Sequence, residues 1–184
     1  LDEILTDHAE VFTELKEYYK QTSESDTTKI SFYEDTYSLY NLYRFAHYYE
    51  EAYGKYIWLK SGASLVIEHT EAMTVIDVNT GSVLKKKKQE DTLFYQINRE
   101  AAKEIARQLR LRNISGIIMI DFINMKDTAQ KEKLLSLLDS ECKKDRVHCN
   151  VIDMTALNLV EMTRSKVRKP LHEQIRSCMK NNRS

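Results

Sequence analysis

Three apolar stretches decide the fold of this chain: SLVIEH at 64–69, MTVIDV at 73–78 and GIIMIDF at 116–122. Each is rich in β-branched and other apolar residues, which is typical of strands. The third is a continuous apolar run of the kind found in strands that are buried on both faces. Between the second and third strands, residues 99–112 repeat apolar side chains at helical spacing, and Asn98 is the expected N-cap.

The same alternation continues toward the C-terminus. We expect a helix over 128–144, a strand over 150–154 and a helix over 156–164, followed by a basic tail. The stretch 81–96, which contains the lysine run 85–88, is expected to be a loop. Strands that alternate with helices indicate an α/β (α+β) fold with a sheet at its centre.

Composition divides the chain in two. The 184 residues contain 28 Lys plus Arg and 28 Asp plus Glu, so the formal net charge is zero. Residues 1–58, however, hold 12 acidic and 5 basic side chains, and ten of the eleven tyrosines. A shift this sharp indicates two units that meet near 54–61, of which the second is basic and is the one to search for an anionic partner.

The first unit is predicted to be mostly helical. Helical spacing covers 8–21 and 36–53, with a short strand over 29–33 between them. The second helix carries a tyrosine stripe, which has two interpretations: a platform on which single-stranded bases stack, or a helix face packed on a neighbour. In so acidic a segment the second interpretation is favoured. The stripe comprises Tyr37, Tyr40, Tyr43 and Tyr48.

Several classes of protein are excluded by simple features of the sequence. No apolar run approaches the ~20 residues of a membrane helix, and the acidic N-terminus is unlike a secretory signal. Three unevenly spaced cysteines suit neither a disulfide scaffold nor a four-ligand zinc site, so we expect a cytoplasmic protein. There is no HExxH motif and no glycine-rich loop before a helix.

Carboxylates at the ends of core strands are the strongest candidates for chemistry. Asp77 and Asp121 each end an apolar strand, and α/β sites usually assemble at such a rim. Mg²⁺ is commonly held by one or two carboxylates, which leaves positions open for a phosphate. Asn79, two residues past Asp77, points to the same side and would orient a ligand. Asp153 has the same local pattern, so pattern alone does not separate it from the other two.

A row of cations on the helix after Asn98 suggests contacts with phosphates. Spacings of four, four and three residues place Arg99, Lys103, Arg107 and Arg110 on one face of the helix. Such a row positions a nucleic acid without reading its sequence. The alternative is a solvated face neutralised by Glu100 and Glu104. The cations proposed here to bind substrate are Arg107, Arg110 and Arg112 from this helix and Arg164 from the basic tail region.

Read together, three ordered blocks closely resemble the ribonuclease E/G family. They are WLKSGASLVIEHTEAMTVIDVNTG (58–81), NREAAKEIARQLRLRNISGIIMIDFINM (98–125) and LVEMTRSKVRKPL (159–171). The resemblance implies a DNase I-like catalytic subdomain over 59–171, built on a mixed sheet with flanking helices. It further implies that 1–58 is part of an RNase H-like subdomain, with 172–184 as a basic tail.

The resemblance also implies an activity. Members of the family are Mg²⁺-dependent endoribonucleases that cut single-stranded RNA to leave a 5′-phosphate and a 3′-hydroxyl. Their metal-binding aspartates correspond to Asp77 and Asp121, and their supporting asparagine to Asn79, which selects this trio over Asp153. Mn²⁺ is an alternative ion, and a homodimer through the DNase I-like part is allowed.

Some features of the family are not matched. The S1 domain and the 5′-end sensor lie upstream of the matched region, and the cysteine pair of the zinc link is absent, since Cys178 stands alone, so no zinc is expected. The sequence therefore suggests a fragment of the catalytic core or a reduced homologue. Three hypotheses compete: an endoribonuclease core, a basic module that holds RNA without cutting it, and a piece whose role is oligomerisation.

Overall fold

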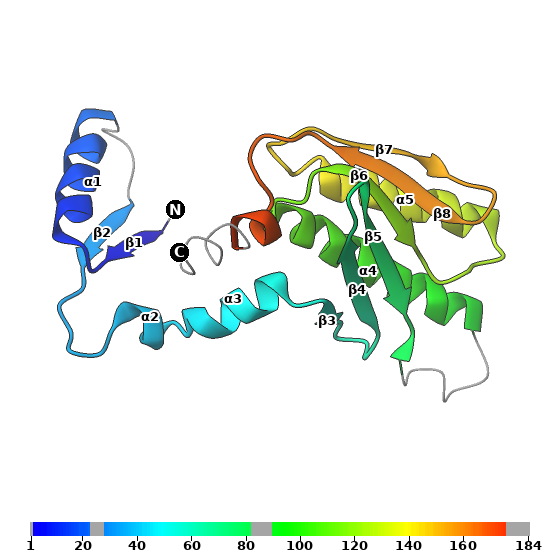
Figure 1. Cartoon of the computed structure of the whole chain (residues 1–184), viewed down its shortest axis with the longest axis horizontal. Coiled ribbons are helices and arrows are strands. Elements are labelled where there is room, and N and C mark those ends of the chain that lie inside the picture. The colour runs from blue at the N-terminus through cyan, green and yellow to red at the C-terminus, as the bar shows by residue number, and fades with distance from the viewer. Residues whose placement is uncertain (1, 23–27, 82–89, 176–184) are drawn as a thin grey trace. The chain divides into compact units, whose positions relative to one another are not determined.

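The computed structural model describes residues 2–22, 28–81 and 90–175 (Figure 1). It divides into two compact units, 1–50 and 51–184. The division lies a few residues before the composition break that the sequence places at 54–61. The lysine run 85–88 and Cys178 lie outside the described residues.

The first unit begins with two parallel strands, β1 (Glu3–Thr6) and β2 (Lys29–Phe32), joined by the helix α1 (Ala9–Thr22). The ring of Phe12 packs against that of Phe32 with centroids 5.3 Å apart, which holds α1 on the strands. The helix and β2 agree with the sequence prediction. The short strand β1 was not predicted.

Two short helices replace the single helix expected over 36–53: α2 (Leu39–Leu42) and α3 (Phe45–Tyr53). Arg44 lies between them with φ of 51°, in the left-handed region, which ends the first helix. The tyrosine stripe defined above, Tyr37, Tyr40, Tyr43 and Tyr48, is exposed. The packed helix face that the sequence favoured is therefore wrong within this unit.

The second unit is built on a six-stranded mixed sheet, in the order β3-β4-β5-β6-β8-β7. Only β5 and β6 run parallel, joined by a helix on one face, while all other neighbours are antiparallel. This is the mixed sheet with flanking helices that the sequence predicts. The elements are β3 (Tyr56–Trp58), β4 (Ser64–His69), β5 (Met73–Asn79), α4 (Glu90–Leu111), β6 (Gly116–Asp121), α5 (Thr128–Cys142), β7 (Cys149–Met154) and β8 (Leu159–Arg164).

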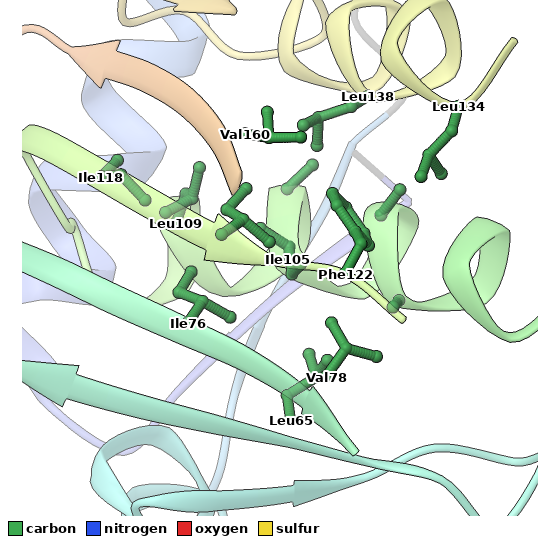
Figure 2. Close-up of a cluster of buried hydrophobic side chains, with 14 of the residues drawn as sticks. Leu65, Ile76, Val78, Ile105, Leu109, Ile118, Phe122, Leu134, Leu138 and Val160 are labelled. Carbon is green, nitrogen blue, oxygen red and sulfur yellow. The ribbon is translucent and has the colours of Figure 1, made fainter. Parts of the chain in front are cut away.

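One face of the sheet packs against α4 and α5 and forms the core. Every second residue of the central strands points toward the apolar faces of both helices. Figure 2 shows this for Ile76 and Ile118 of the strands and for Ile105 and Leu138 of the helices. All four of these side chains are fully buried. The other strand residues point to the opposite face, which no described helix of this unit covers; we call it the open face.

The strand β8 corrects a prediction. The sequence favoured a helix over 156–164, but residues 159–164 form a strand between β6 and β7. Burial alternates along it, with Val160, Met162 and Arg164 buried. Apolar side chains at alternate positions match the period of a strand, and they fill the place beside β6 where a partner strand completes the core.

The strand β6 is exposed on one side. The apolar run GIIMIDF suggested a strand buried on both faces, yet Ile117 is 49% exposed on the open face. Ile118 and Ile120 are fully buried on the other face. The run is continuously apolar because the residues of β6 on the open face, such as Ile117, are apolar as well as those in the core.

The helix α4 begins nine residues before the predicted start at residue 99. It runs over Glu90–Leu111, so Asn98 lies inside it and is not its N-cap. The helix spans 22 residues and carries charged side chains along its outer side. Among the described residues, no helix is long and apolar enough to cross a membrane.

Candidate metal centre

Two carboxylates meet at the C-terminal ends of the parallel strands β5 and β6. In the register of this pair Asp77 lies directly beside Asp121, and neighbouring strands are about 4.8 Å apart. Ile76 and Ile120, the residues just before them, point into the core. Both carboxylates therefore stand on the open face, at the rim where the sequence placed them.

Asn79 completes the group. It lies two residues past Asp77 and so shares the open face. Its amide Nδ2 donates a hydrogen bond of 2.7 Å to Oδ2 of Asp77. The structure therefore brings together all three residues that the sequence nominated, and Asn79 fixes the orientation of one carboxylate.

Gly81 sets the position of the strand end. It has φ of +56°, and a Cβ atom there would lie 2.6 Å from the carbonyl oxygen of Gly62. A glycine is required where two main chains approach this closely. The end of β5 is thus held against the turn between β3 and β4.

The two carboxylates place negative charge side by side at the ends of β5 and β6. Burial, followed by the charge of Asp77, raises the pKa of Asp121. None of the ion pairs formed by the described residues includes either aspartate. Two carboxylates with no cation between them repel each other, and an arriving divalent cation relieves that repulsion.

The donor set fits a magnesium-type ion. Within 2–22, 28–81 and 90–175 no group of three or more His, Cys, Asp or Glu side chains gathers to hold a metal. Two carboxylates on their own suit Mg²⁺, which keeps several waters and is often bound by one or two carboxylates plus substrate phosphate. Zinc prefers nitrogen and sulfur ligands, and within the described part of the chain no His or Cys side chain joins the two carboxylates to form such a group.

Replacing Asp121 with asparagine is expected to stabilise the metal-free protein at neutral pH. Because the folded state raises the pKa of Asp121, ionising this group costs stability above the ordinary pKa of about 3.9. The gain should disappear as the pH falls below that value, where the group is protonated in both states. Thermal unfolding in a chelator at several pH values measures it.

At saturating Mg²⁺ the parent should be more stable than Asp121→Asn, the reverse of the order in chelator, because only the parent is stabilised by binding the ion. An asparagine variant that is less stable than the parent in chelator at neutral pH would contradict the charge repulsion.

Asn98 links α4 to the chain just beyond the candidate site. This side chain is fully buried, its Nδ2 donates to the carbonyl of Ile123 at 2.8 Å, and its Oδ1 accepts from the Ile123 amide at 3.0 Å. The segment after Asp121 is thereby fixed on the helix. The sequence pattern suggested a cap, and only the fold shows that this side chain instead pairs with main chain 25 residues away.

The structure corrects the role expected of Arg112. This residue is 3% exposed, and its guanidinium donates to Gln108 Oε1 and to the carbonyls of Gly54 and Glu51. Its donors are used inside the protein, where it ties the end of α3 to α4. A side chain held in this way does not reach a phosphate, so the expected substrate contact is wrong for Arg112.

Arg164 is corrected for the same reason. It is 4% exposed and forms an ion pair of 2.9 Å with Asp145, and it also donates to Asn113 Oδ1 and to the carbonyl of Ile114. The residue belongs to β8 and not to a basic tail. Its charge joins the loop before β7 to the loop before β6, so it stabilises the fold.

Arg107 and Arg110 are not brought together with the carboxylates. They lie near the C-terminal end of α4, on the covered side of the sheet, whereas Asp77 and Asp121 end their strands on the open face. Arg107 is also paired with Glu104 at 2.8 Å and with Glu51 at 3.5 Å. That Arg107 and Arg110 bind substrate stays a prediction.

Asp153 stands apart from the candidate site. It lies on the edge strand β7 opposite Glu161, and β8 separates it from β6. Its carboxylate accepts a hydrogen bond of 2.7 Å from the amide of Met154. The third carboxylate suggested by the pattern therefore makes a local hydrogen bond within its own strand.

A cavity of about 320 Å³ lies at the other end of β4 and is a separate feature. His69 and His172 stack there with ring centroids 3.8 Å apart. Burial, followed by the positive charges of His172 and Arg112, lowers the pKa of His69 to about 4, so this ring is neutral at physiological pH. The cavity holds none of the residues of the carboxylate site.

Known proteins resemble this chain over nearly all of its length. The profile of the Ribonuclease E/G family matches residues 1–167. Ribonuclease G of Escherichia coli (strain K12) is 38% identical over 171 residues, and that of Haemophilus influenzae is 39% identical over the same length. Both matches cover 93% of this chain and 35% of the relative.

More distant relatives carry the other name of the family. Ribonuclease E of Nostoc sp. is 34% identical over 176 residues, which cover 94% of this chain and 26% of that protein. The chain thus spans about a third or less of the length of these relatives. The family match extends over nearly all of the sequence, and the chain belongs to the ribonuclease E/G family.

Proposed function

We propose that this chain carries the catalytic metal site of an endoribonuclease that hydrolyses single-stranded RNA. The observation that carries the proposal is the register of β5 and β6, which sets Asp77 directly beside Asp121 with Asn79 bonded to the first. A pair of adjacent carboxylates can hold a divalent cation, and such an ion neutralises charge in a reaction at a phosphate.

Each residue of the trio has a distinct role in this proposal. Asp77 and Asp121 would hold Mg²⁺, or Mn²⁺ in its place. When bound, the ion supplies positive charge that offsets the charge developing on the scissile phosphate and favours deprotonation of the attacking water. Asn79 keeps Asp77 in one orientation through its amide hydrogen bond, so the carboxylate does not have to reorder when substrate arrives.

The proposed reaction breaks the bond between phosphorus and the 3′-oxygen. Water attacks the phosphorus, the 3′-oxygen leaves and takes up a proton, and the phosphate stays on the downstream product. The products therefore carry a 3′-hydroxyl and a 5′-phosphate. Relatives named Ribonuclease G and Ribonuclease E support RNA as the substrate class.

A cleavage assay tests the proposal. A 5′-monophosphorylated single-stranded RNA is incubated with the chain, with and without Mg²⁺, and the ends of the products are mapped. We expect cleavage only with the ion, and downstream products whose 5′-phosphate permits direct ligation. Products with a 2′,3′-cyclic phosphate, or equal cleavage in chelator, would overturn the metal-assisted mechanism.

A second outcome separates the site from the activity. If no RNA is cut but a Mg²⁺ titration shows binding that Asp77→Asn removes, the chain holds the metal and requires other parts of a longer protein to hold RNA. Such a result would assign this chain the non-cleaving role. If neither cleavage nor metal binding is found, the assignment of the site is wrong.

We also propose a cytoplasmic location, where RNA processing takes place, and self-association through the second unit. Sedimentation equilibrium over a range of protein concentrations tests the second point. A monomer mass that does not change with concentration would contradict it.

A further inference from the structure

The edge strand β3 presents two large aromatic rings to solvent. Tyr56 is 60% exposed and Trp58 is 73% exposed, whereas Ile57 between them is 4% exposed and packs into the core. This is the alternation of a strand, so both rings stand on one face of the sheet. Most of the surface of Trp58 is left without a contact, and packing alone does not account for such a side chain.

The register across the sheet places these rings on the open face, in line with the candidate metal centre. Residues that pair across neighbouring strands point to the same face. The register gives one row of Tyr56, Val66, Asp77 and Asp121, and a second row of Trp58, Ser64 and Asn79. Each ring is therefore two strands, or roughly 10 Å, from a member of the proposed catalytic trio.

The strand that carries the rings is held in place. The amides of Lys60 and Ser61 donate to the two carboxylate oxygens of Glu100 on α4, at 2.7 and 3.2 Å. On the other side of the same turn, Gly62 meets Gly81 at the end of β5. The turn that follows Trp58 is thus fixed both to α4 and to the strand of Asp77, so the rings have a defined position relative to the carboxylates.

We propose that Tyr56 and Trp58 form a stacking platform that holds a nucleobase of single-stranded RNA close to the scissile phosphate. The inference rests on the proposed function, since it takes RNA as the occupant of the open face. Aromatic rings stack on unpaired bases of any sequence, and a paired base has no free face to offer. The platform would therefore select single strands without selecting a sequence.

A fluorescence titration tests the platform without any need for catalysis. Trp58 is the only tryptophan of the 184 residues, so its emission reports on this position alone. The chain is titrated in chelator with a 2′-O-methyl oligouridine, which carries bases but resists cleavage. We expect saturable quenching of Trp58. An abasic oligomer of equal length and charge is the matched control and should leave the emission unchanged.

Substitutions separate stacking from packing. Trp58→Ala and Tyr56→Ala should each weaken binding of a labelled oligouridine about tenfold, as measured by fluorescence anisotropy, whereas Trp58→Phe and Tyr56→Phe should retain most of it. Tyr53→Ala is the matched control, because Tyr53 is an exposed aromatic of the same unit that lines the separate cavity near His69. Circular dichroism of each variant establishes that it is folded.

The outcomes distinguish this inference from the proposed function. Quenching that is absent, or equal with the abasic oligomer, would overturn the platform even if Mg²⁺-dependent cleavage is intact. Base-dependent quenching in a chain that cuts no RNA would support the platform and count against the proposed activity. In a chain that does cut, substrates are compared that each carry one abasic nucleotide at a different position. Cleavage should be slowed only when the abasic nucleotide lies at one or two positions near the cut. Equal slowing from every position would contradict the placement of the platform.

Discussion

Replacing Asp77 with asparagine is expected to slow RNA cleavage about 1000-fold or more while the fold is retained. The substitution removes one of the two carboxylates that meet at the ends of β5 and β6, and with it half of the negative charge that would hold the ion. If the ion contributes about 4 kcal/mol to stabilising the transition state, its loss slows the reaction by about three orders of magnitude.

The measurement is the initial rate of cleavage at a fixed Mg²⁺ concentration, together with a Mg²⁺ titration of each variant. The loss should be in metal affinity and in rate, and higher Mg²⁺ should restore part of it. Asp153→Asn is the matched control, because Asp153 also ends an apolar Val-Ile-Asp stretch but lies on β7, away from the pair. If Asp77→Asn cuts RNA as well as the parent, or if Asp153→Asn is equally impaired, the assignment fails.

Replacing Arg164 with alanine is expected to lower the free energy of unfolding by about 3–5 kcal/mol, the range found when one partner of a buried ion pair is removed. The side chains of Arg164 and Asp145 are only 3% and 7% exposed. The substitution leaves Asp145 charged and buried, and it removes the donor to the carbonyl of Ile114. Urea denaturation measures the loss.

Two further variants check this interpretation. Arg168→Ala removes an exposed arginine four residues later and should change stability by less than about 0.5 kcal/mol. The double variant Arg164→Met with Asp145→Leu should recover much of the loss, since no unpaired charge remains in the interior. If Arg164→Ala is as stable as the parent but binds RNA more weakly, the original assignment of Arg164 to substrate binding is correct after all.

The effect of Arg164 should depend on pH. Burial by itself raises the pKa of Asp145, but the hydrogen bond and charge of Arg164 and the amide of Val147 lower it by more, so the net pKa lies below the ordinary value. A lowered folded-state pKa contributes stability above the unfolded pKa of about 3.9, and that contribution is lost as the pH falls through the folded pKa. The difference between parent and Arg164→Ala should therefore narrow in acid.

Several elements show where local pattern was a sufficient guide. The strands β4 and β5 and the helix α5 match their predictions closely, because each has a strong period and a clear start or stop. Asp127, for example, caps α5 by accepting from the amide of Ala129, as a residue of its type is expected to do. The sequence also indicated that the carboxylate trio would lie together, since strand ends in an α/β alternation meet at one rim; its catalytic role stays a prediction.

Other elements show where local pattern was misleading. The stretch 159–164 suits a helix or a strand by its apolar content, and its position beside β6 decides for the strand. The cations of 99–112 and 164 look alike in sequence, but burial separates them: Arg112 and Arg164 serve the interior, and Arg107 stays at the surface. Long charged side chains are expected at the surface, because they are almost never fully buried unless paired. Only the fold shows which of these arginines has partners in the interior.

The sequence by itself determined the family, and the resemblance carried with it the expectation of a mixed sheet. It also nominated the two aspartates and the asparagine as site candidates, because that choice depends on residue type and order along the chain. The tertiary structure decided which side chains share a face. Tyr56 and Trp58 gave no functional signal in the sequence, and their place two strands from the candidate metal centre follows from a register that joins β3, β4 and β5. A shift of one residue in that register would turn every side chain of a strand to the other face, so this information lies in the pairing of strands and not in any one of them.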